Sequence, residues 1–381
     1  MKPLFTGTGT ALITPFKNGE IDWDALDNLV ESQIAGGVSA LIAAGTTGEP
    51  STMTWDEHIE VIRFVAERAK DRACVIAGTG SNCTREVIHA ANVVKDFGVA
   101  AQLVVTPYYN KSTQEGLVAH YTEIAEKTSL PIVVYNVPSR TGVNIQPATL
   151  EKICRLPQVV AVKEANPDVA QAMEKINLVG DDATFYCGND DLTIPLMVLG
   201  FQGVISVLSN VMPAETSKMT SLALSGNWAE ASKMQRDLLP MVKALFCETS
   251  PIPCKAAMSM MGMCRNELRL PLIPMQEANQ QKLADMEIAL QNTRNMLYRT
   301  LWKMDNGQSV RIDSALLKRY AAQQCTWVCN EALQIYGGLG FTTETRLGRL
   351  WLDCRGMQIA GGTDEIMVYI AGRQIAKEYA R

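Results

Sequence analysis

The sequence predicts an α/β fold in which a TIM barrel, eight parallel strands closed on themselves, is followed by helices. Three observations support this prediction. Eight short apolar runs alternate with segments of helical period, the runs are almost continuously apolar, and no Gly-x-Gly-x-x-Gly motif follows the first run. The last observation argues against the structural alternative, an open doubly wound sheet.

The predicted strands are short, and a helical segment follows each of them. This order is that of repeated βα units, in which the residues after each strand meet at one face of the barrel. A functional site is therefore expected at the strand ends. The strands are predicted at Gly9–Thr14, Ala40–Ala44, Cys74–Gly78, Gln102–Thr106, Ile132–Asn136, Val159–Lys163, Thr184–Cys187 and Gly203–Val207.

Local signals mark the ends of the helices. Thr54 followed by Glu57 forms a capping box, and Gly36 and Gly37 stop the first helix. Helices between strands are predicted at Trp23–Ala35, Trp55–Ala69, Thr84–Phe97 and Thr113–Lys127. After the eighth strand, helices are predicted at Ala214–Ser225, Trp228–Cys247 and Pro253–Met263.

The sequence changes in character near Ala284, where β-rich runs cease and long helical patterns begin. Helices are expected at Asp285–Asp305, at Asp313–Tyr336 with Asp313 as its N-cap, and at Thr363–Ala380, with a turn at Gly337–Gly340. We therefore predict three segments: a barrel over residues 1–212, its C-terminal helices over 213–283, and a separate helical segment over 284–381.

The composition is that of an ordinary soluble globular protein, with 47% hydrophobic and 20% charged residues. A net charge of −5 without any basic run argues against nucleic acid as a partner. The N-terminus lacks the apolar core and cleavage site of a signal peptide, and no apolar run is long enough to span a bilayer. We expect a cytoplasmic protein that does not enter a membrane.

Ten cysteines and three histidines are the residues most able to bind a soft metal ion. The cysteines are scattered singly, without a Cys-x-x-Cys pair, and the histidines are too few to complete a zinc site. We therefore expect no metal site and thiols that stay reduced.

Lys163 is the first candidate for chemistry, because it directly follows the apolar run Val159–Val162. Burial at a strand end disfavours the ammonium ion and favours the neutral amine, which can attack a carbonyl carbon. The alternative is a lysine whose charged end extends to water. The residues at the other strand ends decide between the two.

Those strand ends carry polar residues suited to one reaction. Gly45–Glu49 offers backbone N–H groups and hydroxyls for a carboxylate, although a tight βα turn is an alternative interpretation. Thr106–Asn110 and Tyr135–Gly142 supply phenols. A buried amine, a phenol that moves protons and a carboxylate cradle together suit Schiff-base chemistry on a 2-oxo acid.

Five motifs, in this order and spacing, resemble the dihydrodipicolinate synthase family: Gly45–Glu49, Thr106–Asn110, Tyr135–Gly142, Val162–Glu164 and Gly203–Ser206. The resemblance covers about residues 3–283. It implies a Schiff-base-forming lyase, commonly a homotetramer, that condenses pyruvate with L-aspartate 4-semialdehyde to 4-hydroxy-tetrahydrodipicolinate in diaminopimelate and lysine biosynthesis. It implies neither a metal nor an organic cofactor. A homo-oligomer, dimer or tetramer, is expected.

The resemblance also implies a role for each matching residue. Lys163 is the Schiff-base lysine, and Tyr135 is the phenol that transfers protons. Thr46 and Tyr109 complete the proton relay, with Tyr109 reaching into the site of a neighbouring subunit. Thr46 and Thr47 also hold the carboxylate of pyruvate.

Further positions concern the second substrate and the pocket wall. Arg140 is expected to orient the carboxylate of the second substrate, and Gly188 and Ile205 to line the pyruvate pocket. Sister enzymes with the same lysine and tyrosine, such as N-acetylneuraminate lyase and 2-oxo-3-deoxy-sugar aldolases, are the nearest alternatives. Arg140 and the pair Tyr108-Tyr109 favour the synthase.

Four residues match the family's regulatory pocket for lysine: His58, Asn82, Glu86 and Tyr108. Pro50 and Trp55 lie at positions that vary with lysine sensitivity in the family. The sequence leaves open whether lysine inhibits this chain.

Residues from about 285 onwards resemble another family, the acyl-CoA dehydrogenases, through Leu333–Phe341, Arg349–Arg355 and Gly362–Ile366. In that family such segments contact flavin, so a flavin-binding or interaction module is an alternative function. Gly361 stands where many members carry a catalytic glutamate, and most of the flavin and acyl-CoA site is missing. We therefore predict a fused fragment without dehydrogenase activity, whose incomplete bundle exposes apolar faces and self-associates or docks on the barrel.

Overall fold

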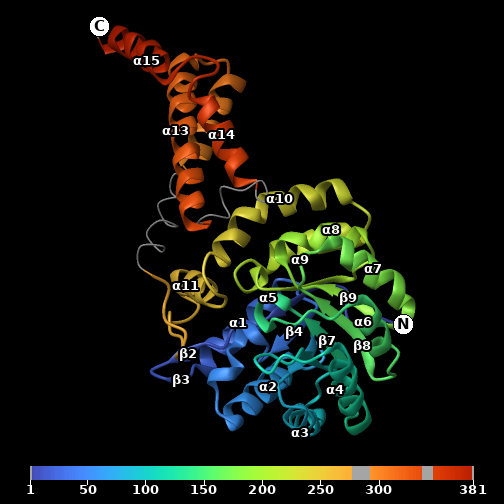
Figure 1. Cartoon of the computed structure of the whole chain (residues 1–381). Helices are drawn as coiled ribbons and strands as arrows, with labels where there is room; N and C mark the ends of the chain where they lie inside the picture. Colours follow the sequence, from blue (N-terminus) through green and yellow to red (C-terminus); the bar gives the residue numbers. More distant parts are fainter. Residues whose placement is uncertain (1, 277–291, 337–345, 380–381) are drawn as a thin grey trace. The chain divides into compact units, whose positions relative to one another are not determined.

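The computed structural model describes residues 2–276, 292–336 and 346–379. The chain forms two compact units, Met1–Pro274 and Met275–Arg381 (Figure 1). The predicted boundary near residue 284 lies outside the described residues.

The first unit is a closed barrel of eight parallel strands, so the predicted fold is confirmed. Each strand pairs with its neighbours along the chain, and the last pairs with the first, with Gly9 opposite Ile205. The strands are β1 (Gly7–Ala11), β4 (Ala40–Ala43), β5 (Cys74–Gly78), β6 (Ala101–Val105), β7 (Ile132–Asn136), β8 (Val159–Glu164), β9 (Thr184–Cys187) and β10 (Gly203–Ser206). The first strand begins two residues before its predicted start, because its pairing with β10 starts at Gly7.

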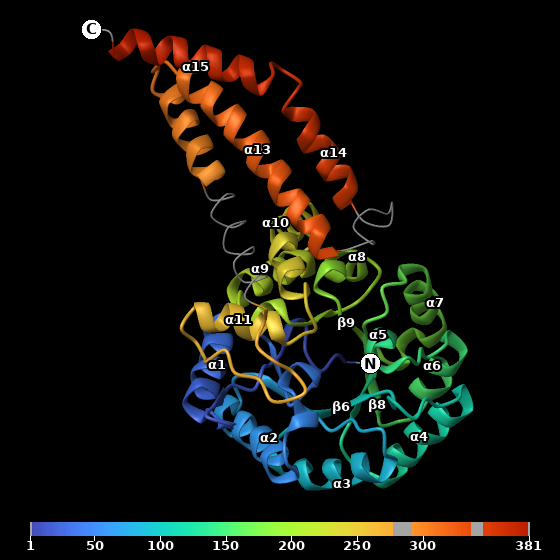
Figure 2. The same ribbon diagram turned by 60° about the vertical axis from the view of Figure 1, so that its left-hand side comes forward.

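Helices surround this barrel, and Figure 2 shows α1, α2, α3, α4, α6 and α7 arranged around the strands. They are α1 (Trp23–Ala35), α2 (Trp55–Ala69), α3 (Thr84–Val94), α4 (Gln114–Lys127), α5 (Pro138–Thr141), α6 (Pro147–Cys154), α7 (Val169–Val179), α8 (Thr193–Val198), α9 (Pro213–Leu224), α10 (Trp228–Leu245) and α11 (Ile252–Met260). The predicted capping box of Thr54 and Glu57 starts α2, and Gly36 caps the end of α1.

A small hairpin between β1 and α1 was not predicted. It pairs β2 (Phe16–Lys17) with β3 (Glu20–Ile21). Its turn residues Asn18 and Gly19 have φ angles of 58° and 85°, the left-handed conformation that a two-residue hairpin turn requires. An Asn-Gly pair is the strongest short-range hairpin signal, so the sequence did contain the information.

The second unit is helical in its described part. A helix covers residues 292–305, and α13 (Arg311–Tyr336) packs against α14 (Leu347–Met357) and α15 (Asp364–Tyr379). Helix α14 was not predicted, and the predicted turn over residues 337–340 lies outside the described residues.

The prediction of Asp313 as an N-cap was wrong. Helix α13 begins at Arg311, so Asp313 lies in its first turn, where its carboxylate pairs with Lys303 Nζ at 2.8 Å.

None of the helices in the described residues has both the length and the apolar character needed to cross a bilayer.

Candidate active site

A β-bulge turns Lys163 towards the inside of the barrel. Val159 packs in the outer layer, between strands and helices, whereas Ala161 packs in the inner layer. In a regular strand two residues that are two apart share a face, so the register shift at Val160 adds one residue and reverses the alternation. Lys163 therefore shares the inner face with Tyr135, its register partner on β7.

The amine of Lys163 lies over the ring of Tyr135, with Nζ 4.3 Å from the ring centroid. Both side chains are buried, with 5% and 6% exposed. The predicted pair of amine and phenol is thus brought together.

Three lysines are buried among the described residues: Lys163, Lys175 and Lys255. Lys175 pairs with Glu164 at 2.7 Å, and Lys255 pairs with Glu49 at 2.5 Å. Within the described part of the chain, Lys163 has no carboxylate at ion-pair distance. An amine that no carboxylate holds as ammonium is the best suited of the three to act as a nucleophile.

The Gly45–Glu49 segment forms a 3₁₀ turn, Thr46–Gly48, directly after β4. Thr47 is buried and Thr46 is partly exposed. The residues that lead from β4 into this turn pack closely on β5, where a Cβ at Gly78 would overlap the carbonyl group of Ala44.

Glu49 ends that segment and has a structural contact. Its carboxylate and the amine of Lys255 form an ion pair in which the side chains are 1% and 0% exposed. Burial lowers the pKa of Lys255 below its usual value. The amine also donates to the Glu267 carbonyl at 2.9 Å, so the turn is tied to the segment that follows α11.

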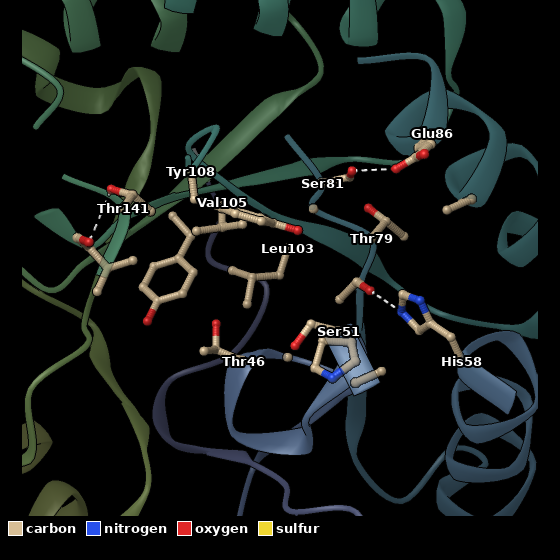
Figure 3. Close-up of a pocket in the computed structure, with 18 of the residues that line it drawn as sticks. Thr46, Ser51, His58, Thr79, Ser81, Glu86, Leu103, Val105, Tyr108 and Thr141 are labelled. Atoms are coloured by element: carbon tan, nitrogen blue, oxygen red, sulfur yellow. Dashed lines mark hydrogen bonds between the residues drawn. The ribbon is translucent and has the colours of Figure 1, made fainter. Parts of the chain in front are cut away.

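A cavity of about 500 Å³ opens at the carboxyl ends of the strands. Figure 3 shows Thr46 and Thr141 on one side of it, and His58 and Glu86 on the other. Six of the twelve predicted site residues line it: Thr46, Tyr135, Arg140, His58, Glu86 and Tyr108. The other six do not: Lys163, Thr47, Tyr109, Asn82, Gly188 and Ile205.

Arg140 lies on the short helix α5, which follows β7. Its side chain is exposed, and its Nη2 donates to the Ser250 carbonyl at 3.1 Å. The guanidinium retains further N–H groups that can bind a carboxylate at the cavity wall.

Tyr109 is almost fully exposed to solvent. Its side chain is 92% exposed, and its backbone has a φ angle of 68° in the loop after β6. A left-handed conformation is unfavourable for a residue with a bulky side chain.

Gly188 lies against the end of β8, and Ile205 lies on β10, two strands away from Lys163. The Gly188 N–H donates to the Glu164 carbonyl at 2.7 Å, and a Cβ on Gly188 would come within 2.6 Å of the Ala165 side chain. Ile205 is fully buried in the inner layer.

The residues of the predicted regulatory pocket lie near one another. His58 Nε2 is 2.7 Å from the Gly78 carbonyl, and burial lowers the pKa of His58. Asn82 Nδ2 donates to the Tyr108 carbonyl at 3.2 Å. Burial, together with the charge of Glu86, raises the pKa of Tyr108.

Asp190 is a buried carboxylate that was not predicted. It is 3% exposed and accepts hydrogen bonds from Ser206 Oγ at 2.5 Å and from the N–H groups of Val207 and Leu208 at 2.9 and 3.0 Å. Burial raises its pKa. The signal was an acidic residue two positions after Gly188, at the end of a strand.

Comparison with known proteins decides the family. Residues 4–289 match the dihydrodipicolinate synthetase family. The chain is 46% identical over 281 residues to the 4-hydroxy-tetrahydrodipicolinate synthase of Geobacter metallireducens, covering 74% of this chain and 97% of that protein. The chain belongs to the dihydrodipicolinate synthetase family.

Other members of the family give the same result. The 4-hydroxy-tetrahydrodipicolinate synthase of Alkaliphilus oremlandii is 47% identical over 289 residues, which are 76% of this chain and 99% of that one. The crystal structure of dihydrodipicolinate synthase from Thermotoga maritima has a TM-score of 0.73 and 45% identity, covering 74% of this chain and 97% of that one.

The C-terminal part resembles a different family. Residues 264–376 match the C-terminal domain of acyl-CoA dehydrogenases, so the chain carries a segment beyond the part that its synthase relatives share.

Among the described residues, no cluster of three or more His, Cys, Asp or Glu side chains could hold a metal ion.

Proposed function

We propose that this protein is a Schiff-base-forming lyase that condenses pyruvate with L-aspartate 4-semialdehyde to 4-hydroxy-tetrahydrodipicolinate. Membership of the synthase family supports the reaction. The observation that carries the mechanism is the amine of Lys163, buried without a carboxylate partner in the described residues and 4.3 Å from the ring centroid of Tyr135.

The reaction begins at Lys163. Its neutral amine adds to the keto carbon of pyruvate, and loss of water gives an imine. Loss of a methyl proton converts the imine to an enamine, whose carbon attacks the aldehyde carbon of the second substrate. The aldehyde oxygen takes up a proton, and the amino group that came from the semialdehyde then adds to the imine carbon, which closes the ring and expels the amine of Lys163. Every bond is made between the substrates and this amine, so the proposed steps need no cofactor.

Tyr135 transfers the protons that these steps require, in a relay with Thr46, which lines the same cavity. Thr46 and Thr47 hold the carboxylate of pyruvate at the 3₁₀ turn after β4. Gly188 and Ile205 shape the pocket around Lys163.

Arg140 orients the carboxylate of the second substrate. Its guanidinium lines the cavity beside Tyr135, and a charge-assisted bond to a carboxylate fixes both position and direction. This residue favours the synthase over N-acetylneuraminate lyase and the 2-oxo-3-deoxy-sugar aldolases.

Tyr109 acts in the site of a neighbouring subunit, and the active form is a homo-oligomer. The residue is 92% exposed and held in a left-handed conformation, which costs conformational energy that a contact between subunits would offset. Of the four residues that match the family's regulatory pocket for lysine, His58, Glu86 and Tyr108 line the cavity itself, and Asn82 donates to the Tyr108 carbonyl.

The full chain, incubated with pyruvate and aspartate semialdehyde, tests the proposal. The product should form in this mixture, and N-acetylneuraminate should not be cleaved. Cleavage of N-acetylneuraminate without condensation would assign the chain to the sister enzymes instead. A colourless preparation that condenses the two substrates would also exclude flavin from the reaction.

A further inference from the structure

A buried hydrogen bond joins the carboxyl ends of β7 and β8 on the face opposite the site. Asn136 follows Tyr135 and Glu164 follows Lys163, so alternation along each strand directs both side chains outwards. Asn136 Nδ2 donates to Glu164 Oε1 at 2.8 Å. Asn136 is fully buried, and Glu164 is 1% exposed.

Both members of this hydrogen bond are held by further partners. The second oxygen of Glu164 pairs with Lys175 Nζ of α7 at 2.7 Å, and both side chains are 1% exposed. The N–H of Asn166 donates to Glu164 Oε1 at 2.8 Å. Asn136 Oδ1 accepts from the N–H of Ile145 at 3.0 Å. Side-chain bonds therefore connect two strand ends to a helix behind them.

The β-bulge at Val160 explains why such a connection matters. Lys163 faces the inside only because one extra residue precedes it, and a slip of one residue would turn its side chain outwards. The Asn136–Glu164 hydrogen bond lies one register position beyond the Tyr135–Lys163 pair. It fixes the register on the far side of the bulge.

We propose that Asn136 and Glu164 are positioning residues, which hold Lys163 and Tyr135 in register so that the amine meets the keto carbon of pyruvate correctly. The inference rests on the proposed function, because it assigns these residues to the imine-forming step. Their side chains lie on the face of the two strands opposite Lys163 and Tyr135. They act through the two strands.

Two neutral double variants of the full chain test this. Asn136 Nδ2 donates both to Glu164 Oε1 and to Asn144 Oδ1, at 2.8 and 2.9 Å. Glu164→Gln with Lys175→Met keeps the acceptor on β8, and Glu164→Met with Lys175→Met removes that acceptor alone. Both remove the buried charges together, which proteins generally tolerate, whereas loss of one charge alone leaves its partner unpaired. Asn136→Ala breaks the same hydrogen bond from β7, together with the bonds of Asn136 to Asn144 and Ile145, and leaves the Glu164–Lys175 pair intact.

The measurement is the rate at which borohydride traps pyruvate on Lys163, together with the pyruvate concentration for half-maximal rate. Pyruvate should be trapped at least about tenfold faster on the Glu164→Gln double variant than on the Glu164→Met double variant. Misplacement of a reacting group by about 1 Å can lower a reaction rate about a hundredfold. Asn136→Ala should trap pyruvate as slowly as the Glu164→Met double variant does. The half-maximal concentration should change little, because the carboxylate turn after β4 is untouched.

Equal trapping rates in the two folded double variants would overturn the proposal and leave the network a purely structural role. Trapping of Asn136→Ala as fast as the unchanged chain would overturn it as well. If the unchanged chain is not trapped at Lys163, the proposed function itself fails, so the two failures are distinguishable.

Discussion

Tyr135→Phe removes one oxygen atom from the residue that faces Lys163. The ring is 6% exposed and packs in the inner layer, so the substitution leaves the packing almost unchanged. A positioned acid–base group contributes about 10²- to 10⁴-fold to a rate, which corresponds to about 3–5 kcal/mol of activation free energy. We expect kcat to fall by about this factor, while the thermal unfolding temperature changes little.

Exchange of the pyruvate methyl protons for deuterium, followed by NMR, isolates the imine and enamine steps from the condensation. Tyr186→Phe is a matched control, because Tyr186 lies opposite Lys163 on β9 but its hydroxyl donates to the Phe5 carbonyl at 2.7 Å. Tyr186→Phe should exchange protons within a few-fold of the unchanged chain. Exchange by Tyr135→Phe at the rate of the unchanged chain would refute the assignment of the phenol as the proton carrier.

Three further predictions concern charged groups. Arg140→Ala should raise KM for aspartate semialdehyde about 10- to 100-fold while pyruvate is still trapped, as steady-state kinetics would measure; an unchanged KM would contradict its role. Lys255→Met leaves Glu49 buried and unpaired, and should lower the free energy of unfolding by about 3–5 kcal/mol in urea, whereas adding Glu49→Gln should restore most of it. The hydrogen bond from Arg269 lowers the pKa of Glu57 to about 2, below the ordinary 4.5, so its stabilisation is present above pH 4.5 and is lost as the pH falls towards 2. Glu57→Gln should therefore be less stable at pH 7 by about 2 kcal/mol but not at pH 2, and a difference that persists at pH 2 would contradict this.

The barrel could be predicted because its strands are buried on both faces and therefore have almost continuously apolar sequences. The bounds of β4, β5, β7 and β9 follow from such runs to within a residue. The hairpin at Asn18-Gly19 was within reach of the same reasoning.

The direction of Lys163 could not be predicted. The run Val159–Val162 has no polar residue to show which positions face inwards, so the bulge at Val160 leaves no trace in the sequence. Burial at a strand end followed from that run, and Lys163 is 5% exposed. Its placement beside Tyr135 depends on a backbone irregularity that pairing with β7 reveals.

Partners that are distant in the sequence were also beyond prediction. Glu49 belongs to the Gly45–Glu49 segment, yet its partner Lys255 lies on α11. No local pattern connects a turn after the second barrel strand with a helix near the end of the unit. Only the closed barrel brings these two charges together.

Trapping with borohydride tests the central claim most directly. The full chain is reduced in the presence of pyruvate and digested, and the modified peptide is identified by mass spectrometry, with Lys163→Met as the control. The account predicts one adduct, on Lys163, and none on the control. A folded chain that shows no adduct, or an adduct on Lys175 or Lys255, would contradict it.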